Sequence, residues 1–365
     1  WNANGGEVRV GFGSQGWVTN NWLKVEEGGI VTNAGTITVG FVNARSAVEN
    51  KLIVTNGGRL CSTGSCYIGY VRNTGTAGYS ADSNTAVIVG GAYGDSIMNL
   101  GNTDINIGVI VSAVCTGRSN ELFVLSGGIV TNCRTLAVGK GTNSFGNRVT
   151  LGSGIMCISN LTANTGPESQ FRFNSGTLRL MTTIVSNSPP FTVGDGAQTA
   201  EMNMIGTTNQ SLVFTNGLVV TNSGILSGSG RILSPATVTG TLSPGTGSTA
   251  SSIVFTAGLA FTNTSTLRFS IGGTGQGTQH DYIDASGLTV DLAGSSLQVD
   301  LVNYVPQSTY AFTNLVAGTL NGTFGNLYGN RVRDTGGQGS FAVSTSGNRV
   351  VLNDYQVDAS VFLFW

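Results

Sequence analysis

The segment Asn50–Gly69, NKLIVTNGGRLCSTGSCYIG, recurs without a gap at two other places in this chain of 365 residues. Asn21–Gly40 reads NWLKVEEGGIVTNAGTITVG, and Asn120–Gly139 reads NELFVLSGGIVTNCRTLAVG. Each copy places a leading asparagine, the second glycine of a pair and a third glycine at the same three positions. These residues are Asn21, Gly29, Gly40, Asn50, Gly58, Gly69, Asn120, Gly128 and Gly139. Because self-similarity at a period of about 20 to 50 residues is the signature of repeat architectures, the sequence predicts stacked structural units.

Each copy holds three short apolar pieces, and the alternation inside each piece is typical of a strand with one buried face. Glycines lie between the pieces, where they permit the tight bends that a rapidly turning chain requires. The spacing between copies varies mainly after the third glycine, as expected for a loop at one corner. The repeat therefore predicts an all-β fold, a parallel β-helix or β-solenoid with about three strands per coil, in which each coil bonds to its neighbours.

The leading asparagine has two interpretations. Side-chain amides at equivalent positions of stacked coils could bond to one another as a ladder. Equally, each asparagine could be a turn residue that bonds to its own backbone. The sequence leaves both interpretations open.

The composition argues against several classes of function. The chain has 55 glycines, one histidine and only 10% charged residues, against roughly a quarter in ordinary domains. The net charge of -1 and the scattered basic residues argue against nucleic-acid binding, because phosphates are held by clustered lysines and arginines. No stretch is long and apolar enough for a membrane-spanning helix. Because the sequence begins with Trp1 rather than methionine, we expect that a targeting segment has been removed.

The repeats resemble those of large bacterial surface proteins and autotransporter-type passengers. The resemblance rests on the series N-x-L-x-V-x-x-G-G that opens the copies. From about Ser223 on, the stretches GILSGSGRILSPATVTGTLSPG, STLRFSIGGTG and HDYIDASGLTVDLAGSSLQVDL are similar to the autotransporter-associated β-strand repeat. Together the resemblance covers most of residues 5–352. It implies a right-handed β-helix in a protein that is secreted or displayed at the surface of a bacterium.

Three regions follow from the repeat and the resemblance. Residues 1–224 are expected to form solenoid repeats, and residues 225–353 a more irregular, β-rich continuation similar to the autotransporter-associated repeats. Residues 354–365 are expected to form an apolar C-terminal strand, since the chain ends in VFLFW.

The five cysteines lie in the first half of the chain, and Cys61 and Cys66 are close in sequence. Their spacing in CSTGSC allows a local disulfide, or two ligands of a metal site that would need two more. The third interpretation is that the cysteines are buried apolar thiols, since free cysteine packs like a small hydrophobic residue. All three interpretations remain open.

Few residues are arranged as a catalytic site would need. His280 and Asp281, with Asp284 nearby, are the one place where a histidine lies beside carboxylates, and we interpret them as the turn that leads into a strand. The glycine-rich stretch Gly272–Gly277 precedes no helix that could hold a phosphate. The acids are dispersed, which argues against a polysaccharide-cleaving enzyme. The sequence therefore predicts no enzyme and no cofactor, with structural calcium near Asp195 as an alternative.

All four tryptophans lie near the ends of the chain, at Trp1, Trp17, Trp22 and Trp365. Tryptophan is enriched where protein surfaces meet, and a solenoid without a polar cap exposes unpaired strands. We therefore predict an assembly interface between the first coil and the apolar tail of a neighbouring copy. Its residues are Trp1, Trp17, Trp22, Val361, Phe362, Leu363, Phe364 and Trp365.

The leading functional hypothesis is an extracellular structural protein that associates head to tail or by strand addition into a filament, sheath or layer. The alternative is a surface adhesin that presents its corner loops, such as Val71–Ser83 and Val111–Ser119, to glycans or cells. A carbohydrate-active β-helix enzyme is the third. In the first hypothesis the partner is a second copy of this chain.

Overall fold

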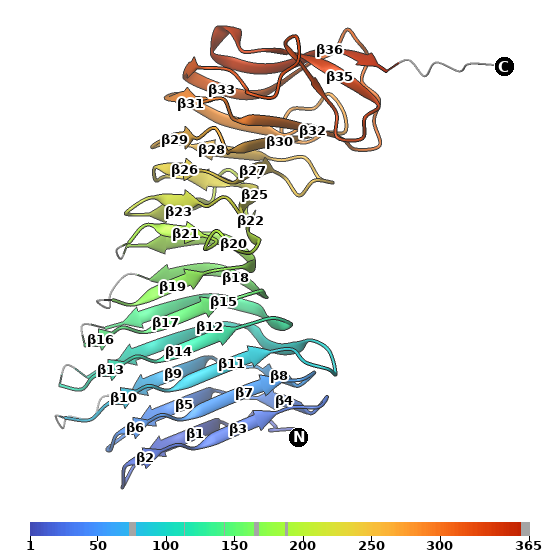
Figure 1. Ribbon diagram of the computed structural model, residues 1–365. Coiled ribbons are helices and arrows are strands. Elements are labelled where there is room, and N and C mark those ends of the chain that lie inside the picture. The colour runs from blue at the N-terminus through green and yellow to red at the C-terminus, as the bar shows by residue number, and fades with distance from the viewer. Residues whose placement is uncertain (73–77, 113, 142, 164–167, 187–188, 359–365) are drawn as a thin grey trace. The chain divides into compact units, whose positions relative to one another are not determined.

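The computed structural model describes residues 1–72, 78–112, 114–141, 143–163, 168–186 and 189–358 (Figure 1). Residues in strands and isolated bridges make up 61% of the described residues, and parallel sheets are present. The helical structure in this described part is the short 3₁₀ turn Ser346–Asn348. No helix there is long and apolar enough to cross a membrane. The predicted all-β class with parallel strand pairing is therefore confirmed.

The chain divides into two compact units. Unit 1 contains Trp1–Glu201 and Val213–Asn216, and unit 2 contains Met202–Leu212 and Gly217–Trp365. The chain passes between the units within β22 (Ala200–Ile205) and β23 (Ser211–Phe214). The predicted division after residue 224 remains a prediction.

In unit 1, the strands that follow the leading asparagines pair in parallel from one repeat to the next. This first series consists of β3 (Trp22–Val25), β7 (Lys51–Thr55), β11 (Thr85–Val89), β14 (Glu121–Val124), β17 (Arg148–Leu151), β19 (Gln170–Phe173) and β21 (Phe191–Val193). Short strands pair in the same way just before the asparagines. They are β2 (Val18–Thr19), β6 (Ala47–Val48), β10 (Ala81–Asp82), β13 (Gly117–Arg118) and β16 (Ser144–Phe145).

Two further parallel series complete the described strands of unit 1. The second series follows the glycine pairs and consists of β4 (Ile30–Ala34), β8 (Arg59–Ser62) and the first parts of β12 (Ser96–Ile110), β15 (Gly128–Lys140), β18 (Gly154–Ala163) and β20 (Gly176–Val185). The third series consists of β1 (Val8–Gly13), β5 (Ile37–Val42), β9 (Cys66–Val71) and the last parts of β12, β15, β18 and β20.

The core of unit 1 is built from columns of apolar side chains at the same strand position in successive repeats. In the first series one column runs through Leu52, Ala86, Leu122 and Val149, all of them fully buried. Within each strand, the residues that alternate with the buried ones point outward and are partly exposed. Because alternate positions are buried, the period-2 pattern of the repeat translates directly into an inner and an outer face.

Unit 2 also contains parallel strands. One series consists of β24 (Leu218–Val220), β26 (Ala236–Val238) and β29 (Leu259–Phe261). The others are β25 (Gly224–Ile232), β27 (Thr241–Pro244), β28 (Ser252–Phe255), β30 (Thr266–Ile271), β31 (Tyr282–Asp291), β32 (Ser296–Leu301) and β33 (Ala311–Asn321).

Parallel pairing in unit 2 gives way to antiparallel pairing after β33. Here β33 pairs with β36 (Arg349–Val357), and β35 (Gly339–Ser344) pairs with both β36 and β34 (Arg331–Arg333), each time antiparallel. An antiparallel meander cannot continue a parallel stack, so this end of unit 2 is closed to a further parallel repeat. The last described residue is Asp358, whose N–H donates to the Gln338 carbonyl. The predicted tail residues 361–365 lie outside the described residues.

Candidate assembly interface

The leading asparagines of unit 1 form a ladder of hydrogen bonds that crosses every repeat between Asn21 and Asn147. At each step, one asparagine donates both its backbone N–H and its side-chain Nδ2 to Oδ1 of the next. For Asn50 the two distances to Asn84 Oδ1 are 3.1 and 2.9 Å. The ladder residues are Asn21, Asn50, Asn84, Asn120 and Asn147, and all except Asn21 are buried.

Both interactions expected for these asparagines are present. Besides its ladder bond, Asn50 Nδ2 donates to the Val48 carbonyl two residues earlier, at 3.2 Å. Asn21 Nδ2 donates in the same way to the Thr19 carbonyl. Asn21 and Asn50 therefore hold their own turns and also bond to the next repeat. In the later ladder residues, Nδ2 instead donates to a carbonyl of an earlier repeat, as from Asn84 to Ala47 at 3.0 Å.

The ladder has a direction. A backbone N–H can only donate, so the atom facing it must be an oxygen, and the orientation of every amide follows from the backbone. All steps donate from the N-terminal repeat toward the C-terminal one, and the last, from the Asn147 N–H, ends on Ser169 Oγ at 3.3 Å. At the opposite end, Asn21 is exposed, and no described residue donates to its Oδ1.

The third glycine of each repeat provides the space for this ladder. A Cβ atom on Gly69 would lie 2.2 Å from Cγ of Asn120, and Gly69 has a φ of +70° that favours glycine. The same collision occurs between Gly11 and Asn50, between Gly40 and Asn84, and between Gly108 and Asn147. Each of these amides thus fills a gap beside the glycine that closes the repeat two before its own, and this contact explains why asparagine and glycine recur together.

The first repeat leaves strand edges unpaired. At the blue end of Figure 1, β1 pairs only with β5, β2 only with β6 and β3 only with β7, among the strands that the structure describes. Residues near the start of the chain cover part of β4, since the Ala3 N–H donates to the Thr32 carbonyl at 2.9 Å. Unpaired N–H and C=O groups of such an edge are a template for pairing with another strand. We call β1, β2 and β3 the open edge.

The predicted interface tryptophans of the first repeat are exposed: Trp17 and Trp22 lie at the open edge, and Trp1 lies along β4. Trp17 precedes β2 and Trp22 begins β3, and the exposed fractions of Trp1, Trp17 and Trp22 are 65%, 71% and 69%. Trp22 also lines an open groove together with Asn21 and the outward-facing residues of β3 and β7. The predicted partner residues Val361, Phe362, Leu363, Phe364 and Trp365 lie outside the described residues, so the structure does not show what they contact.

Charged residues at the open edge are paired within their own repeat. Lys24 forms an ion pair with Glu26, and Arg9 forms one with Glu7. The Arg9 guanidinium also lies 4.6 Å from the ring centroid of Phe12, which starts a stack of rings along β1, β5 and β9. The edge therefore presents aromatic and backbone groups and no cluster of like charges that would repel a neighbour.

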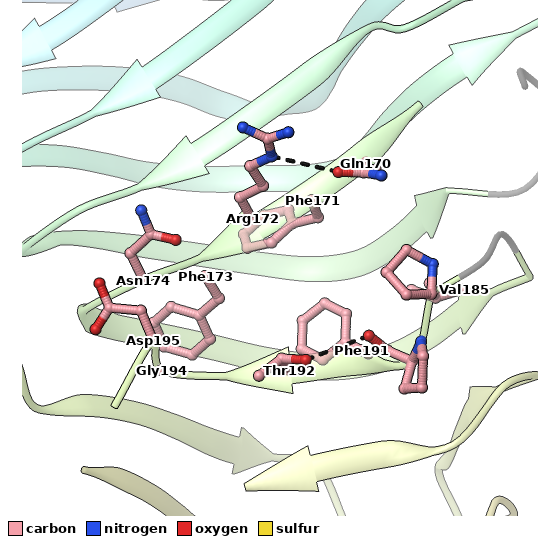
Figure 2. A pocket seen from close by; sticks show the side chains of 12 residues that line it. Gln170, Phe171, Arg172, Phe173, Asn174, Val185, Phe191, Thr192, Gly194 and Asp195 are labelled. Carbon is pink, nitrogen blue, oxygen red and sulfur yellow. Dashed lines mark hydrogen bonds between the residues drawn. The ribbon is translucent and has the colours of Figure 1, made fainter. Parts of the chain in front are cut away.

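An open pocket lies between β19 and β21, and it was not predicted from the sequence. Figure 2 shows the rings of Phe171, Phe173 and Phe191 lining it, with Arg172 and Asp195 among the polar residues around them. The two strands pair only at Phe173 and Val193, which leaves room beside them. Asp195, the predicted calcium residue, uses Oδ1 to accept the Ala197 N–H at 2.9 Å. The pocket is thus lined by aromatic rings with polar residues around them. Its carboxylate, Asp195, already accepts a hydrogen bond within its own turn, from Ala197.

The histidine and carboxylates singled out in the sequence lie at the start of β31, as the interpretation of a turn leading into a strand requires. Asp281 is buried and accepts the backbone N–H groups of Ser251 and Ser270 at 2.9 and 2.7 Å. His280 is also buried, with its ring edge-on to Phe312. Because both side chains are enclosed, neither can reach a substrate in solvent.

Burial shifts the titration of both residues. Desolvation raises the pKa of Asp281 from its ordinary value of 3.8 to about 7, and the hydrogen bonds from the Ser270 and Ser251 backbone offset this only in part. Desolvation lowers the pKa of His280, because the imidazolium form loses its hydration. The folded state therefore favours the neutral forms of both.

The Cys61–Cys66 disulfide, one of the three open interpretations, is not present in the structure. All five cysteines lie in the described part of the chain and are free thiols. Cys66 is buried in β9, whereas Cys61 occupies an outward-facing position of β8, so the two point to opposite sides of the sheet wall. Burial raises the pKa of the Cys66 thiol to about 12, which keeps it protonated. Cys66 thus corresponds to the buried apolar thiol among the three interpretations.

No family model matches this chain, and a search of the curated proteins finds none similar to it. Within the described residues, no three His, Cys, Asp or Glu side chains come together as metal ligands. The predicted adhesin loops each include residues outside the described part, at 73–77 and at 113. The functional argument therefore rests on the ladder and the open edge.

We predict that Gly69→Ala lowers the free energy of unfolding by about 2 to 4 kcal/mol, because the new methyl group collides with the Asn120 amide and the backbone keeps a positive φ. The matched control is Gly28→Ala, where φ is +75° but no atom lies within 4 Å. It should cost only about 1 kcal/mol. Urea unfolding followed by circular dichroism measures both. Equal losses for the two variants would contradict the role of the glycine in housing the ladder.

We also predict opposite pH dependences for Asp281→Asn and His280→Gln. The raised pKa of Asp281 contributes stability that is present below about pH 4 and lost as the pH rises through 7. The lowered pKa of His280 contributes stability that is lost as the pH falls below about 6.5. Relative to wild type, between pH 7 and pH 5, Asp281→Asn should lose about 1 to 3 kcal/mol and His280→Gln should gain. Urea midpoints measured between pH 5 and pH 7 test this. If the midpoints of both variants change with pH in the same way as those of wild type, neither group titrates as argued.

Proposed function

We propose that this chain is a β-solenoid with three strands per coil, right-handed like the passengers it resembles. Its role in this proposal is that of a secreted or cell-surface structural protein of a bacterium that self-associates into a filament, sheath or layer. The parallel register between successive repeats supports the solenoid, as do the three series of longer strands in unit 1, which the short strands before the asparagines accompany. The resemblance of the repeats to passenger proteins supports the location.

The observation that carries the proposal is the open edge with its exposed tryptophans. Burying most of one tryptophan ring contributes about 3 kcal/mol of association free energy before entropy losses. Pairing with an unpaired strand adds main-chain hydrogen bonds. Charged residues make up only 10% of the chain, so little electrostatic repulsion opposes close packing of copies. The open edge thus offers both contributions that strand addition requires, namely burial of tryptophan rings and main-chain hydrogen bonds.

The proposed donor is the segment Ser360–Trp365 of a second copy. Stacking of one parallel end on another is disfavoured, because unit 2 ends in the antiparallel strands β34, β35 and β36. Addition of a single strand to the open edge avoids this mismatch. A contact between two different surfaces of the same chain repeats from copy to copy, and such heterologous contacts generate open polymers.

Deleting Ser360–Trp365 should abolish assembly while leaving the fold intact, since the described strands end at Val357. The double variant Trp17→Ser with Trp22→Ser should weaken assembly at least about 10-fold through lost ring burial. Tyr328→Ser is the control, because Tyr328 is exposed and belongs to unit 2, whereas the open edge belongs to unit 1. Negative-stain electron microscopy and sedimentation velocity measure assembly, and circular dichroism measures the fold. Normal polymers from the truncated chain would rule out the tail as the donor.

A further inference from the structure

We infer that Asn21 is the acceptor that sets the direction and register of the incoming strand at the open edge. This inference rests on the proposed self-association and adds to it the chemistry of the contact. It starts from the one ladder asparagine whose Oδ1 receives no hydrogen bond from a described residue.

Every other ladder oxygen accepts two hydrogen bonds from the preceding repeat. Asn50 Oδ1 receives the Asn21 N–H at 3.2 Å and Asn21 Nδ2 at 2.9 Å. Asn147 Oδ1 receives the Asn120 N–H at 3.0 Å and Asn120 Nδ2 at 2.9 Å. An arriving strand that covers Asn21 must supply an N–H in the same place, because a buried carbonyl without a donor is destabilising. Solvent fills this role only while the edge is uncovered.

The requirement for a donor excludes a symmetric contact at this point. Two copies meeting edge to edge with Asn21 at the two-fold axis would place one Oδ1 against the other, and two acceptors repel. The contact must therefore bring a different segment of the second copy, with its N–H groups directed at Asn21. A strand lying parallel to β3 meets this condition, because it repeats the relation of β3 to β7.

The tail of the second copy has the length and chemistry for this place. Val361–Trp365 contains five residues, as does the stretch Asn21–Val25 that it would cover, and it contains no proline, so every residue has an N–H to donate. Its uncharged side chains match an edge whose charges Lys24 and Arg9 are already paired. In a parallel arrangement Val361 lies beside Asn21 and Trp365 beside Val25.

The decisive variants are Asn21→Ala and Asn21→Ser. Alanine removes the acceptor, whereas serine keeps an oxygen, and Ser169 Oγ already serves as the acceptor at the other end of the ladder. Asn21→Ala should weaken association about 10-fold in sedimentation velocity, and Asn21→Ser should recover most of this loss. Both variants lose the Asn21 Nδ2 bonds to Asn50 and Thr19, but the backbone N–H of residue 21 still donates to Asn50 Oδ1. Both should therefore lower the unfolding temperature slightly and by the same amount, so the difference in association between them reports on the acceptor.

The outcomes separate this inference from the proposed function. If Asn21→Ala assembles like wild type while tail deletion still blocks assembly, the role of Asn21 is overturned and the proposed function stands. If alanine and serine weaken assembly equally and both lower the unfolding temperature, the role of Asn21 is structural and the inference is overturned. If the wild-type chain stays monomeric at all concentrations, both fail.

A cross-linking experiment tests the direction of the strand. The photoreactive residue p-benzoylphenylalanine replaces Trp365 in one copy, and mass spectrometry locates its cross-links on the second. Cross-links near Val25 are expected for the parallel arrangement. Cross-links near Asn21 instead would show antiparallel addition and overturn the predicted direction.

Discussion

The structure of unit 1 depends on a simple constraint: the buried backbone N–H of each leading asparagine must find an acceptor in the next repeat. The amide of the following asparagine provides it, and the amide fits only because a glycine leaves space beside it. The ladder therefore fixes how far one repeat is turned and shifted against the next. With that register set, the apolar columns align and each strand pairs with its counterpart.

The same constraint distinguishes the two ends of the ladder. Ser169 terminates it at one end with a hydroxyl group, while at the other end no described residue donates to the exposed Asn21 Oδ1. Strand edges and exposed tryptophans lie at that second end, in the first repeat. Backbone pairing, ring burial and the amide acceptor are thus all available to one incoming strand, and this coincidence makes the open edge the strongest candidate for function.

Much of the fold could be predicted from the sequence, because the repeat of Asn50–Gly69 encodes strand period, corners and register together. The repeat allowed an asparagine ladder as one of two interpretations, and it did not indicate the ladder's direction, since direction depends on which atoms face one another. The closing antiparallel strands β34–β36 were not predicted, because alternating residues look the same in parallel and antiparallel strands. Nor was the pocket at Phe171, which arises from incomplete pairing of β19 with β21. The sequence could not decide among a disulfide, a metal site and free thiols for Cys61 and Cys66, because spacing in sequence does not show that the two residues face opposite sides.

The most direct test of the central claim is a cryo-electron microscopy reconstruction of the assembled protein. The claim predicts an additional strand beside β3, contributed by the tail of the neighbouring copy and running parallel to it, with a backbone N–H within hydrogen-bonding distance of Asn21 Oδ1. A polymer in which β3 remains uncovered and the copies meet through other surfaces would contradict it.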